Sequence, residues 1–293
     1  MKAFLPWRKS VVLGTLACWL GLLLGACDRA PGRLVGQFEI EDGRRLFLYC
    51  TGPLEGPVVV LDVGAGGTIF SLHDLFADVV PQARICAWDR PGLGLSDPTP
   101  GQIHSGTIVE DLRTLLARAG VPPPYVLVGH SFGGMNMRLF AHRHPRDVAG
   151  MVLIDASHPD QFDRFEALLP PRQPGESLEL RDFRTRDFGN PDVDMETSLR
   201  EVRSADTLGD LPLRVVSRAD DPSPFQIEGL KTEEVEALHR AWMTMQSEQA
   251  ALSRRGRQVI AKAAGHCVHC TEPELVTGAI LEILEIVRGG KNR

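Results

Sequence analysis

The sequence predicts an α/β fold in which helices cover both faces of a mostly parallel, twisted sheet. Short apolar or β-branched runs alternate with stretches of helical periodicity, which is typical of such sheets. One apolar run, Val126-Leu-Val, leads through Gly-His-Ser-Phe-Gly into the helical stretch MNMRLFAHR, a strand–turn–helix sequence. At 293 residues, of which 43% are apolar, the chain suits one globular domain with a substantial core.

We expect residues 1–26 to be a secretion signal rather than part of the fold. Lys2, Arg8 and Lys9 precede an apolar run that extends from Val11 to about Gly25. That run is about 15 residues long, whereas a membrane-spanning helix needs ~20. An uncleaved transmembrane anchor is therefore the weaker alternative.

The end of the signal resembles the bacterial lipobox, because Leu24-Gly25-Ala26 precedes Cys27. The resemblance implies that Cys27 becomes the lipidated N-terminus and that residues 27–37 form a short tether; an ordinary cleaved signal is the alternative. Asp28 is similar to an inner-membrane retention signal. We therefore expect a bacterial cell-envelope lipoprotein that faces the periplasm, on the inner membrane by preference and on the outer membrane as the alternative.

Each expected strand is a short apolar run that ends in turn residues. An amphipathic helix is expected over 108–119, where apolar residues recur at intervals of three and four, and a last helix over 273–287. The segment 158–211 is charged, contains a Pro-Pro pair and is too long for a simple connection. The expected strands span residues 45–50, 57–63, 84–88, 125–129, 150–155, 213–217 and 258–262.

Ser131 lies at the centre of the strand–turn–helix motif and is the candidate nucleophile. The motif GxSxG at a strand-to-helix junction is the nucleophile elbow, in which a strained turn exposes the serine hydroxyl. Gly129 and Gly133 leave room for that turn. The alternative interpretation is a glycine-rich turn with an ordinary surface serine.

A serine hydroxyl needs a base to take its proton, and His266 has the expected position for that base. It follows the last expected strand and precedes the last helix. Among the nine histidines the only rival is His269, about one helical turn later. The others fall in loops, on solvated helix faces or beside other elements.

The acid that orients the imidazole has more than one candidate. Asp155 ends the strand that follows the nucleophile, and Asp220 and Asp221 follow the next strand. Each choice preserves the chain order Ser, Asp, His. We rank Asp155 first, Asp221 second and Asp220 third.

Oxyanion stabilisation requires two preorganised N–H donors. The residue after the nucleophile, Phe132, supplies the first. The loop Gly64-Ala65-Gly66-Gly67 follows an expected strand and supplies the second, through the amide of Ala65 with that of Gly66 as the alternative. A tight connection without a catalytic role is the other interpretation of this loop.

Five motifs in order give the chain a resemblance to the α/β-hydrolase family with a DRxGxGxS loop. They are GAGG, DRPGLGLS, LVGHSFGG, VLIDASHPDQ and a late GH followed by PELV, and the match spans about residues 38–290. The resemblance implies an α/β-hydrolase domain over 38–293, Ser131 as nucleophile and His266 as base. It matches Asp155 to an acid after the sixth strand and Asp221 to the more widespread acid after the seventh. It also implies that 158–211 is a cap over the site.

The resemblance implies a serine hydrolase. Relatives that are epoxide hydrolases or haloalkane dehalogenases carry aspartate where this chain has Ser131. Lactonase, amidase or peptidase, carbon–carbon hydrolase and perhydrolase chemistry share the serine arrangement. Esterase is the default because ester cleavage asks least of the leaving group. A ligand-binding lipoprotein without turnover is the alternative from another class.

We expect a small-molecule, ester-like substrate and no cofactor. The net charge of −6 and the scattered lysines and arginines give no footprint for nucleic acid. Oligomeric state has no signature in the sequence. A metal centre on the cluster His266, Cys267, His269 and Cys270 is disfavoured, because five consecutive residues hardly surround a tetrahedral ion.

Four of the six cysteines remain beyond the signal and the lipidation site, in an oxidising compartment. By the family's strand order, Cys50 and Cys86 lie on neighbouring strands, so we expect a disulfide between them, with two buried free thiols as the alternative. Cys267 and Cys270 form a second possible pair, ranked lower because a bridge beside the base could strain its loop.

Overall fold

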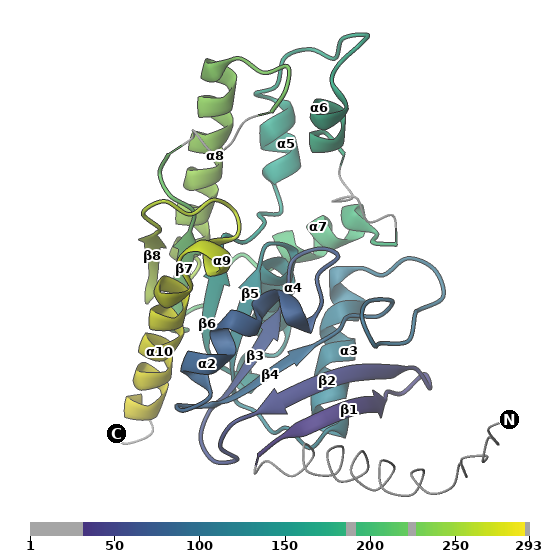
Figure 1. Cartoon of the computed structure of the whole chain (residues 1–293), viewed down its shortest axis with the longest axis vertical. Coiled ribbons are helices and arrows are strands. Elements are labelled where there is room, and N and C mark those ends of the chain that lie inside the picture. The colour runs from purple at the N-terminus through teal and green to yellow at the C-terminus, as the bar shows by residue number, and fades with distance from the viewer. Residues whose placement is uncertain (1–31, 186–191, 222–226, 291–293) are drawn as a thin grey trace, which may run out of the picture.

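The computed structural model of the chain describes residues 32–185, 192–221 and 227–290. Within these ranges eight strands form one sheet in the order β1-β2-β4-β3-β5-β6-β7-β8 (Figure 1). The pairs β1–β2 and β2–β4 are antiparallel, and the remaining pairs are parallel. The predicted signal over 1–26 and the lipidation site Cys27 lie outside the described residues.

Most strand ends lie within two residues of the ends predicted from the sequence. The central ones consist almost wholly of buried apolar residues, as expected for strands covered on both faces. Their bounds are β1 Leu34–Glu39, β2 Arg45–Thr51, β3 Val58–Asp62, β4 Arg84–Trp88, β5 Tyr125–His130, β6 Val148–Ile154, β7 Leu213–Ser217 and β8 Gly256–Ile260.

The predicted tether over 27–37 is wrong at its C-terminal end, because β1 already begins at Leu34. Its six residues alternate between half-buried and exposed and pair antiparallel with β2, with Leu34 opposite Cys50. Main-chain pairing at the edge of the sheet creates this strand. Its apolar content is too low for periodicity alone to identify it.

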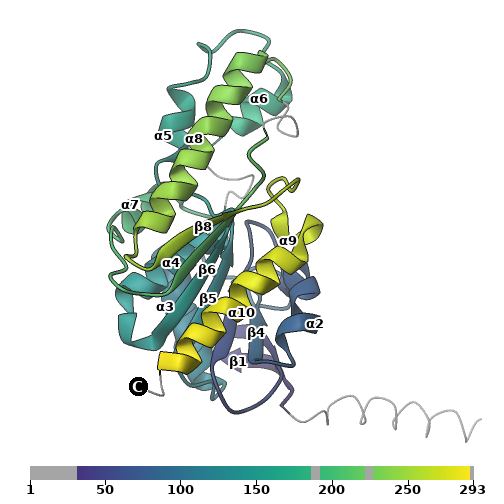
Figure 2. The same ribbon diagram turned by 90° about the vertical axis from the view of Figure 1, so that its left-hand side faces the viewer.

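Helices cover both faces of the sheet (Figure 2). On one face α3 (Ser105–Arg118) and α4 (Phe132–Arg143) pack on a buried apolar cluster that includes Leu112 and Met135. On the other face η1 (Ile69–Leu75), α2 (Phe76–Val79) and α10 (Pro273–Gly290) pack on a second cluster. This three-layer arrangement confirms the predicted α/β-hydrolase architecture.

The segment between β6 and β7 forms a cap, as the sequence predicts for 158–211. It contains α5 (Gln161–Glu166), α6 (Leu178–Phe183) and α7 (Met195–Arg203). The 20-residue helix α8 (Thr232–Ala251) lies between β7 and β8 in sequence and rises alongside α5 (Figure 1). Sequence analysis did not predict this helix. The cap and α8 share an apolar cluster of Phe165, Leu180, Ile227, Leu238, Trp242 and Met245.

Both cysteine pairs are bonded. Cys50 in β2 lies directly opposite Cys86 in β4, and the two α-carbons are 4.1 Å apart. The expected disulfide is thus present, between two fully buried residues. Cys267 and Cys270 are bridged as well, across the start of α9 (Val268–Thr271). No helix in the described part of the chain has the length and apolar character needed to cross a membrane.

Candidate active site

Ser131 occupies the turn between β5 and α4 with φ 53° and ψ −122°, a backbone conformation that L-residues rarely adopt. The turn is possible because its neighbours lack side chains. A Cβ on Gly133 would lie 2.3 Å from the carbonyl oxygen of Asp62, and one on Gly129 would lie 2.6 Å from the Cα of Gly134. Tight packing therefore holds the serine in this conformation, only 8% exposed, at the end of the sheet.

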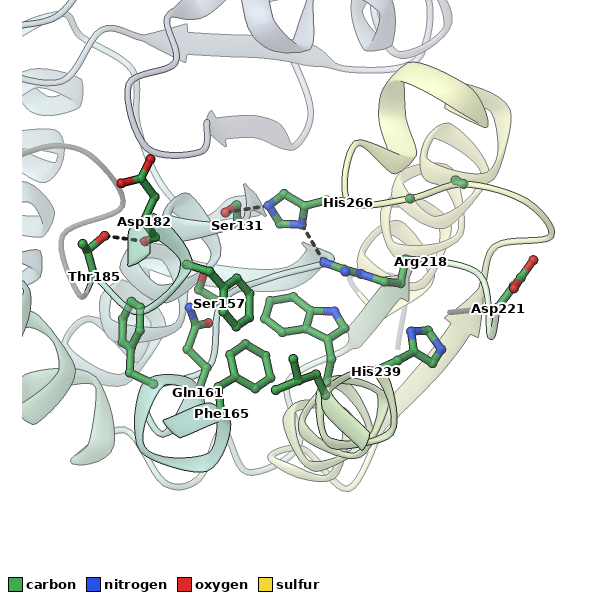
Figure 3. Close-up of a pocket in the computed structure, with 16 residues that line it drawn as sticks. Ser131, Ser157, Gln161, Phe165, Asp182, Thr185, Arg218, Asp221, His239 and His266 are labelled. Carbon is green, nitrogen blue, oxygen red and sulfur yellow. Dashed lines mark hydrogen bonds between the residues drawn. The ribbon is translucent and has the colours of Figure 1, made fainter. Parts of the chain in front are cut away.

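His266 lies on the loop between β8 and α9, and its Nε2 is 2.9 Å from Ser131 Oγ (Figure 3). The loop is fixed on both sides of the imidazole. On one side, the carboxylate of Glu272 accepts hydrogen bonds from the amides of Lys262, Ala263 and Ala264. On the other, the Cys267–Cys270 disulfide closes the first turn of α9. This bracing holds the imidazole beside the serine.

Asp155 completes the row, with Oδ2 2.7 Å from His266 Nδ1. Its side chain is fully buried, and Oδ1 accepts hydrogen bonds from the indole N–H of Trp242 at 2.7 Å and the backbone N–H of Arg218 at 3.1 Å. Burial alone would raise the pKa of this carboxyl. The guanidinium of Arg218 and the hydrogen bond to His266 outweigh burial and hold the pKa of Asp155 well below its usual range. The carboxylate is therefore ionised at neutral pH.

Arg218, the first residue after β7, is the main feature of the site that sequence analysis missed. Its Nε and Nη2 donate to Asp155 Oδ2 at 2.8 and 2.6 Å. Nη2 also lies 3.2 Å from His266 Nδ1. Because a carboxylate only accepts, we assign the Nδ1 hydrogen to the bond with Asp155, so the imidazole and the guanidinium are two donors that share one oxygen.

The other predicted acids lie elsewhere. The carboxylate of Asp221 is exposed and points away from His266 (Figure 3). Asp220 accepts a hydrogen bond from Nε2 of His239 at 3.3 Å. Of the three candidates, the structure thus brings Asp155 to the imidazole.

Two further histidines, His130 and His269, lie close to His266. The ring of His130 lies 4.8 Å from that of His266 and 4.5 Å from that of His269, and its Nε2 lies 3.1 Å from the carbonyl oxygen of His266. Burial, followed by the charge of His266, lowers the pKa of His130 to about 3 and that of His269 to about 4. Both rings are therefore neutral at pH 7. His269, the sequence rival for the base, packs behind the site rather than beside Ser131.

The loop that starts at Gly64 lies against the nucleophile: a Cβ on Gly64 would sit 3.4 Å from the Cβ of Ser131. The buried side chain of Arg90 fixes this loop by donating to Asp62 Oδ1 at 2.8 Å and to the carbonyls of Val63 and Gly64. A trans peptide directs its N–H opposite to its C=O. The Ala65 amide therefore points away from Arg90. Phe132 opens α4, where the first N–H groups point out of the helix.

A cavity of about 750 Å³ opens over Ser131 and His266 beneath the cap. Its walls come from the loop after β6, α5, α6 and α8. The size is within the usual range for a site that encloses a small molecule. Three of the cap phenylalanines contribute to its lining: Phe162, Phe165 and Phe183. The fourth phenylalanine of the cap, Phe188, lies outside the described residues. Met195 and Leu199, which also belong to the cap, pack in the main core.

The cluster Cys267, His269 and Cys270 has its potential ligand atoms within 4.8 Å of one another. Zinc sites of this composition use thiolates. Both sulfurs are joined in a disulfide, so the described arrangement braces the loop of His266 instead of offering a thiolate ligand set.

Comparisons with known proteins point to the same fold. A family profile described as "alpha/beta hydrolase fold" matches residues 57–192. The chain is 28% identical over 229 residues to the uncharacterized protein YqjL of Bacillus subtilis, covering 78% of this chain and 83% of that protein. Two other curated relatives are longer, and the chain spans only 41% and 16% of them.

Solved structures show the same fold. A haloalkane dehalogenase variant from Bradyrhizobium elkanii superposes with a TM-score of 0.63 at 14% identity, covering 89% of this chain and 99% of that one. A thermophilic esterase from Thermogutta terrifontis gives 0.56 at 23% identity, covering 87% and 99%. The chain therefore has the α/β-hydrolase fold.

Proposed function

We propose that the chain is a serine hydrolase that cleaves carboxylic esters through Ser131, His266 and Asp155. The observation that carries the proposal is the continuous row from Ser131 Oγ through the imidazole to the buried carboxylate, with contacts of 2.9 and 2.7 Å. The row begins on the turn at Ser131 and lies beneath the cap, beside a cavity of about 750 Å³.

In the first step His266 Nε2 takes the proton of Ser131 as Oγ attacks the ester carbonyl carbon. The carbonyl oxygen becomes an oxyanion, and the amides of Phe132 and Ala65 donate to it. Asp155 accepts from Nδ1–H and stabilises the imidazolium. The leaving alkoxide then takes the proton from Nε2 and departs as the alcohol, which leaves an acyl group on Ser131.

In the second step water replaces the alcohol. His266 takes a proton from the water, the hydroxide adds to the acyl carbon, and the second oxyanion occupies the same two amides. Collapse breaks the bond to Oγ, which regains the proton from Nε2. The products are an alcohol and a carboxylic acid, and the enzyme returns to its starting state.

A fluorophosphonate probe and a panel of activated esters test the proposal on wild type and Ser131→Ala. We expect the probe to label the Ser131 peptide in wild type and not in Ser131→Ala. Ester turnover by Ser131→Ala should fall to the rate that substrate binding and the oxyanion amides alone support. His266→Ala should lose nearly as much as Ser131→Ala, because triad members act as a unit. Equal labelling of the same peptide in Ser131→Ala, or equal turnover, would contradict the proposal.

We propose further that the mature chain is a lipoprotein of the bacterial cell envelope, acylated at Cys27 and facing the periplasm. The support is the lipobox-like Leu24-Gly25-Ala26 before Cys27. Two disulfides in the described domain agree with an oxidising compartment. Mass spectrometry of the N-terminal peptide tests it: we expect an acylated Cys27 in wild type. A retained Met1 or an unmodified Cys27 would overturn it.

A further inference from the structure

The cavity contains a row of three aromatic rings that begins at the base. Between ring centroids, the indole of Trp242 lies 6.0 Å from the imidazole of His266 and 6.1 Å from the ring of Phe165, which lies 5.4 Å from that of Phe183. The planes of the last two ring pairs are within 28° of parallel. We call Trp242, Phe165 and Phe183 the aromatic wall; all three line the cavity.

The first ring of the aromatic wall is held rigidly. Trp242 Nε1 donates to Asp155 Oδ1 at 2.7 Å, and the guanidinium of Arg218 lies 4.6 Å from the indole ring. The second ring, Phe165, is 8% exposed and packs in the apolar cluster shared by the cap and α8. A ligand group on this wall would therefore meet a preformed apolar surface immediately beside the reacting atoms.

The charges around the cavity disfavour an anionic substrate. Among its described lining residues the one arginine, Arg218, is already paired with Asp155, so its charge is balanced by that carboxylate. Asp182 on α6 lines the cavity and is exposed. Within this described lining, a carboxylate on the substrate would approach the carboxylate of Asp182 without meeting an unbalanced guanidinium.

We propose that the aromatic wall binds an aromatic ring of an uncharged ester, so that esters with an aromatic ring in the acyl or the alcohol part are the substrate class of this site. The rings of Trp242 and Phe165 already have Arg218 and their neighbours in the row over their faces, so a ligand ring adds to the wall through burial and edge-to-face contact. Because Trp242 contacts the base, a ring placed against it lies close to the scissile ester bond. The inference rests on the proposed ester hydrolysis and gives that activity a substrate class.

Two pairs of esters test the inference in a pH-stat assay, and each pair differs on one side of the ester bond. Vinyl acetate and vinyl phenylacetate vary the acyl group, and ethyl acetate and benzyl acetate vary the alcohol. We expect wild type to prefer the aromatic member of at least one pair, by about tenfold or more in kcat/KM, as a well-filled apolar subsite permits. No preference in either pair would overturn the inference.

Substitutions in the aromatic wall test whether the wall causes the preference for aromatic esters. Phe165→Ala should lower the aromatic preference by about tenfold, mainly through KM, and Phe165→Leu should retain part of it. Phe70→Ala is the matched control, since Phe70 is 72% exposed and outside the cavity lining. If Phe165→Ala does not fold, the same measurement is made on Phe183→Ala, at the far end of the aromatic wall. An unchanged preference in a folded wall variant would overturn the inference.

A third comparison tests the charge argument. Wild type should hydrolyse 4-carboxybenzyl acetate several-fold less efficiently than benzyl acetate at low ionic strength, and Asp182→Asn should narrow the gap. Equal rates in wild type would contradict an uncharged substrate. Failure of the underlying ester hydrolysis is a distinct result, because no ester in the panel would then show turnover that depends on Ser131.

Discussion

Arg218 and Asp155 form a buried ion pair directly behind the base. Nε and Nη2 of the guanidinium both donate to Oδ2 of the carboxylate, at 2.8 and 2.6 Å, and the same oxygen accepts from His266 Nδ1 at 2.7 Å. One oxygen atom therefore links the ion pair to the imidazole. The pair makes Arg218 a positioning residue for the carboxylate of Asp155. Arg218 follows β7, the strand after which the more widespread acid, Asp221, was expected.

Replacing Arg218 should change the pH dependence of activity. In Arg218→Gln the burial of Asp155 is no longer opposed by the guanidinium, so the pKa of Asp155 rises toward the working range. The acid limb of the kcat/KM profile should then move to higher pH, and Arg218→Lys should move it less. Arg254→Gln is the control, since Arg254 makes an exposed ion pair with Asp210. An unmoved acid limb in Arg218→Gln would contradict this role.

The same replacement should shift acid unfolding. The folded-state pKa of Asp155 lies below its unfolded value, so its contribution to the free energy of unfolding is present above the unfolded pKa and lost as pH falls through the folded pKa. In Arg218→Gln the folded pKa rises toward or above the unfolded pKa, which does not change, so the loss of stability on acidification that Asp155 causes should shrink or reverse. Urea unfolding from pH 3 to 7 measures the free energy of unfolding of both proteins. The same pH dependence in Arg218→Gln and wild type would rule out the Arg218–Asp155 pair as its cause.

The three candidate acids can be separated by amide substitutions. Asp155→Asn should lower kcat by about 10⁴-fold, because an amide favours the wrong imidazole tautomer. Asp221→Asn and Asp220→Asn should keep most of the activity, since Asp221 points away from His266 and Asp220 contacts His239. Steady-state kinetics of the three variants gives the ranking. A large loss in Asp221→Asn with little in Asp155→Asn would reverse it.

Arg90 should support the oxyanion amides through the carbonyls that it holds. Arg90→Lys keeps the charge but cannot reach Asp62 and two carbonyls at once. If the Ala65 amide then turns away, kcat should fall by up to about 10²-fold with KM little changed, approaching the loss of one oxyanion donor. Arg45→Lys, at an exposed ion pair, is the control. Equal kcat in Arg90→Lys and wild type would exclude this role.

His158 should make the free energy of unfolding fall in mild acid. Burial, followed by the charge of Arg138, lowers the pKa of His158 to about 4. Between its unfolded pKa near 6.5 and pH 4 the unfolded chain binds the extra proton, so stability decreases as pH falls, by about 1.4 kcal/mol per pH unit for this group. His158→Gln should flatten that slope, and exposed His73→Gln should not. Parallel slopes in all three proteins would contradict the assignment.

The positions of Ser131 and His266 in the fold were predictable because they depend on local signals. Ser131 lies within one contiguous motif, and His266 follows the last strand of a fold with a known order of elements. The acid was not predictable to a single residue, since two strand ends reach the same imidazole. What favours Asp155 is its contacts with Arg218 and Trp242, which are 63 and 87 residues away in sequence.

Long-range packing also explains the elements that were missed. β1 owes its place to main-chain pairing with β2, which its weak apolar pattern does not show. Helix α8 did have a signal, because Val235, Leu238, Trp242 and Met245 recur at helical spacing and are buried. Its position beside the cap depends on Phe165 and Leu180, which precede β7, so sequence distance hides the contact.

Within the described ranges, the two non-glycine residues with positive φ are Ser131 at 53° and Asp155 at 38°. Such backbone costs about 1–3 kcal/mol at each residue and persists only where the surroundings impose it; glycine would relieve it. At Ser131 selection for stability alone would thus favour glycine, whereas loss of the Asp155 side chain would leave the buried guanidinium of Arg218 unpaired. A lineage that no longer needed the chemistry should drift to glycine first at Ser131, which makes this position a marker for telling active relatives from inactive ones.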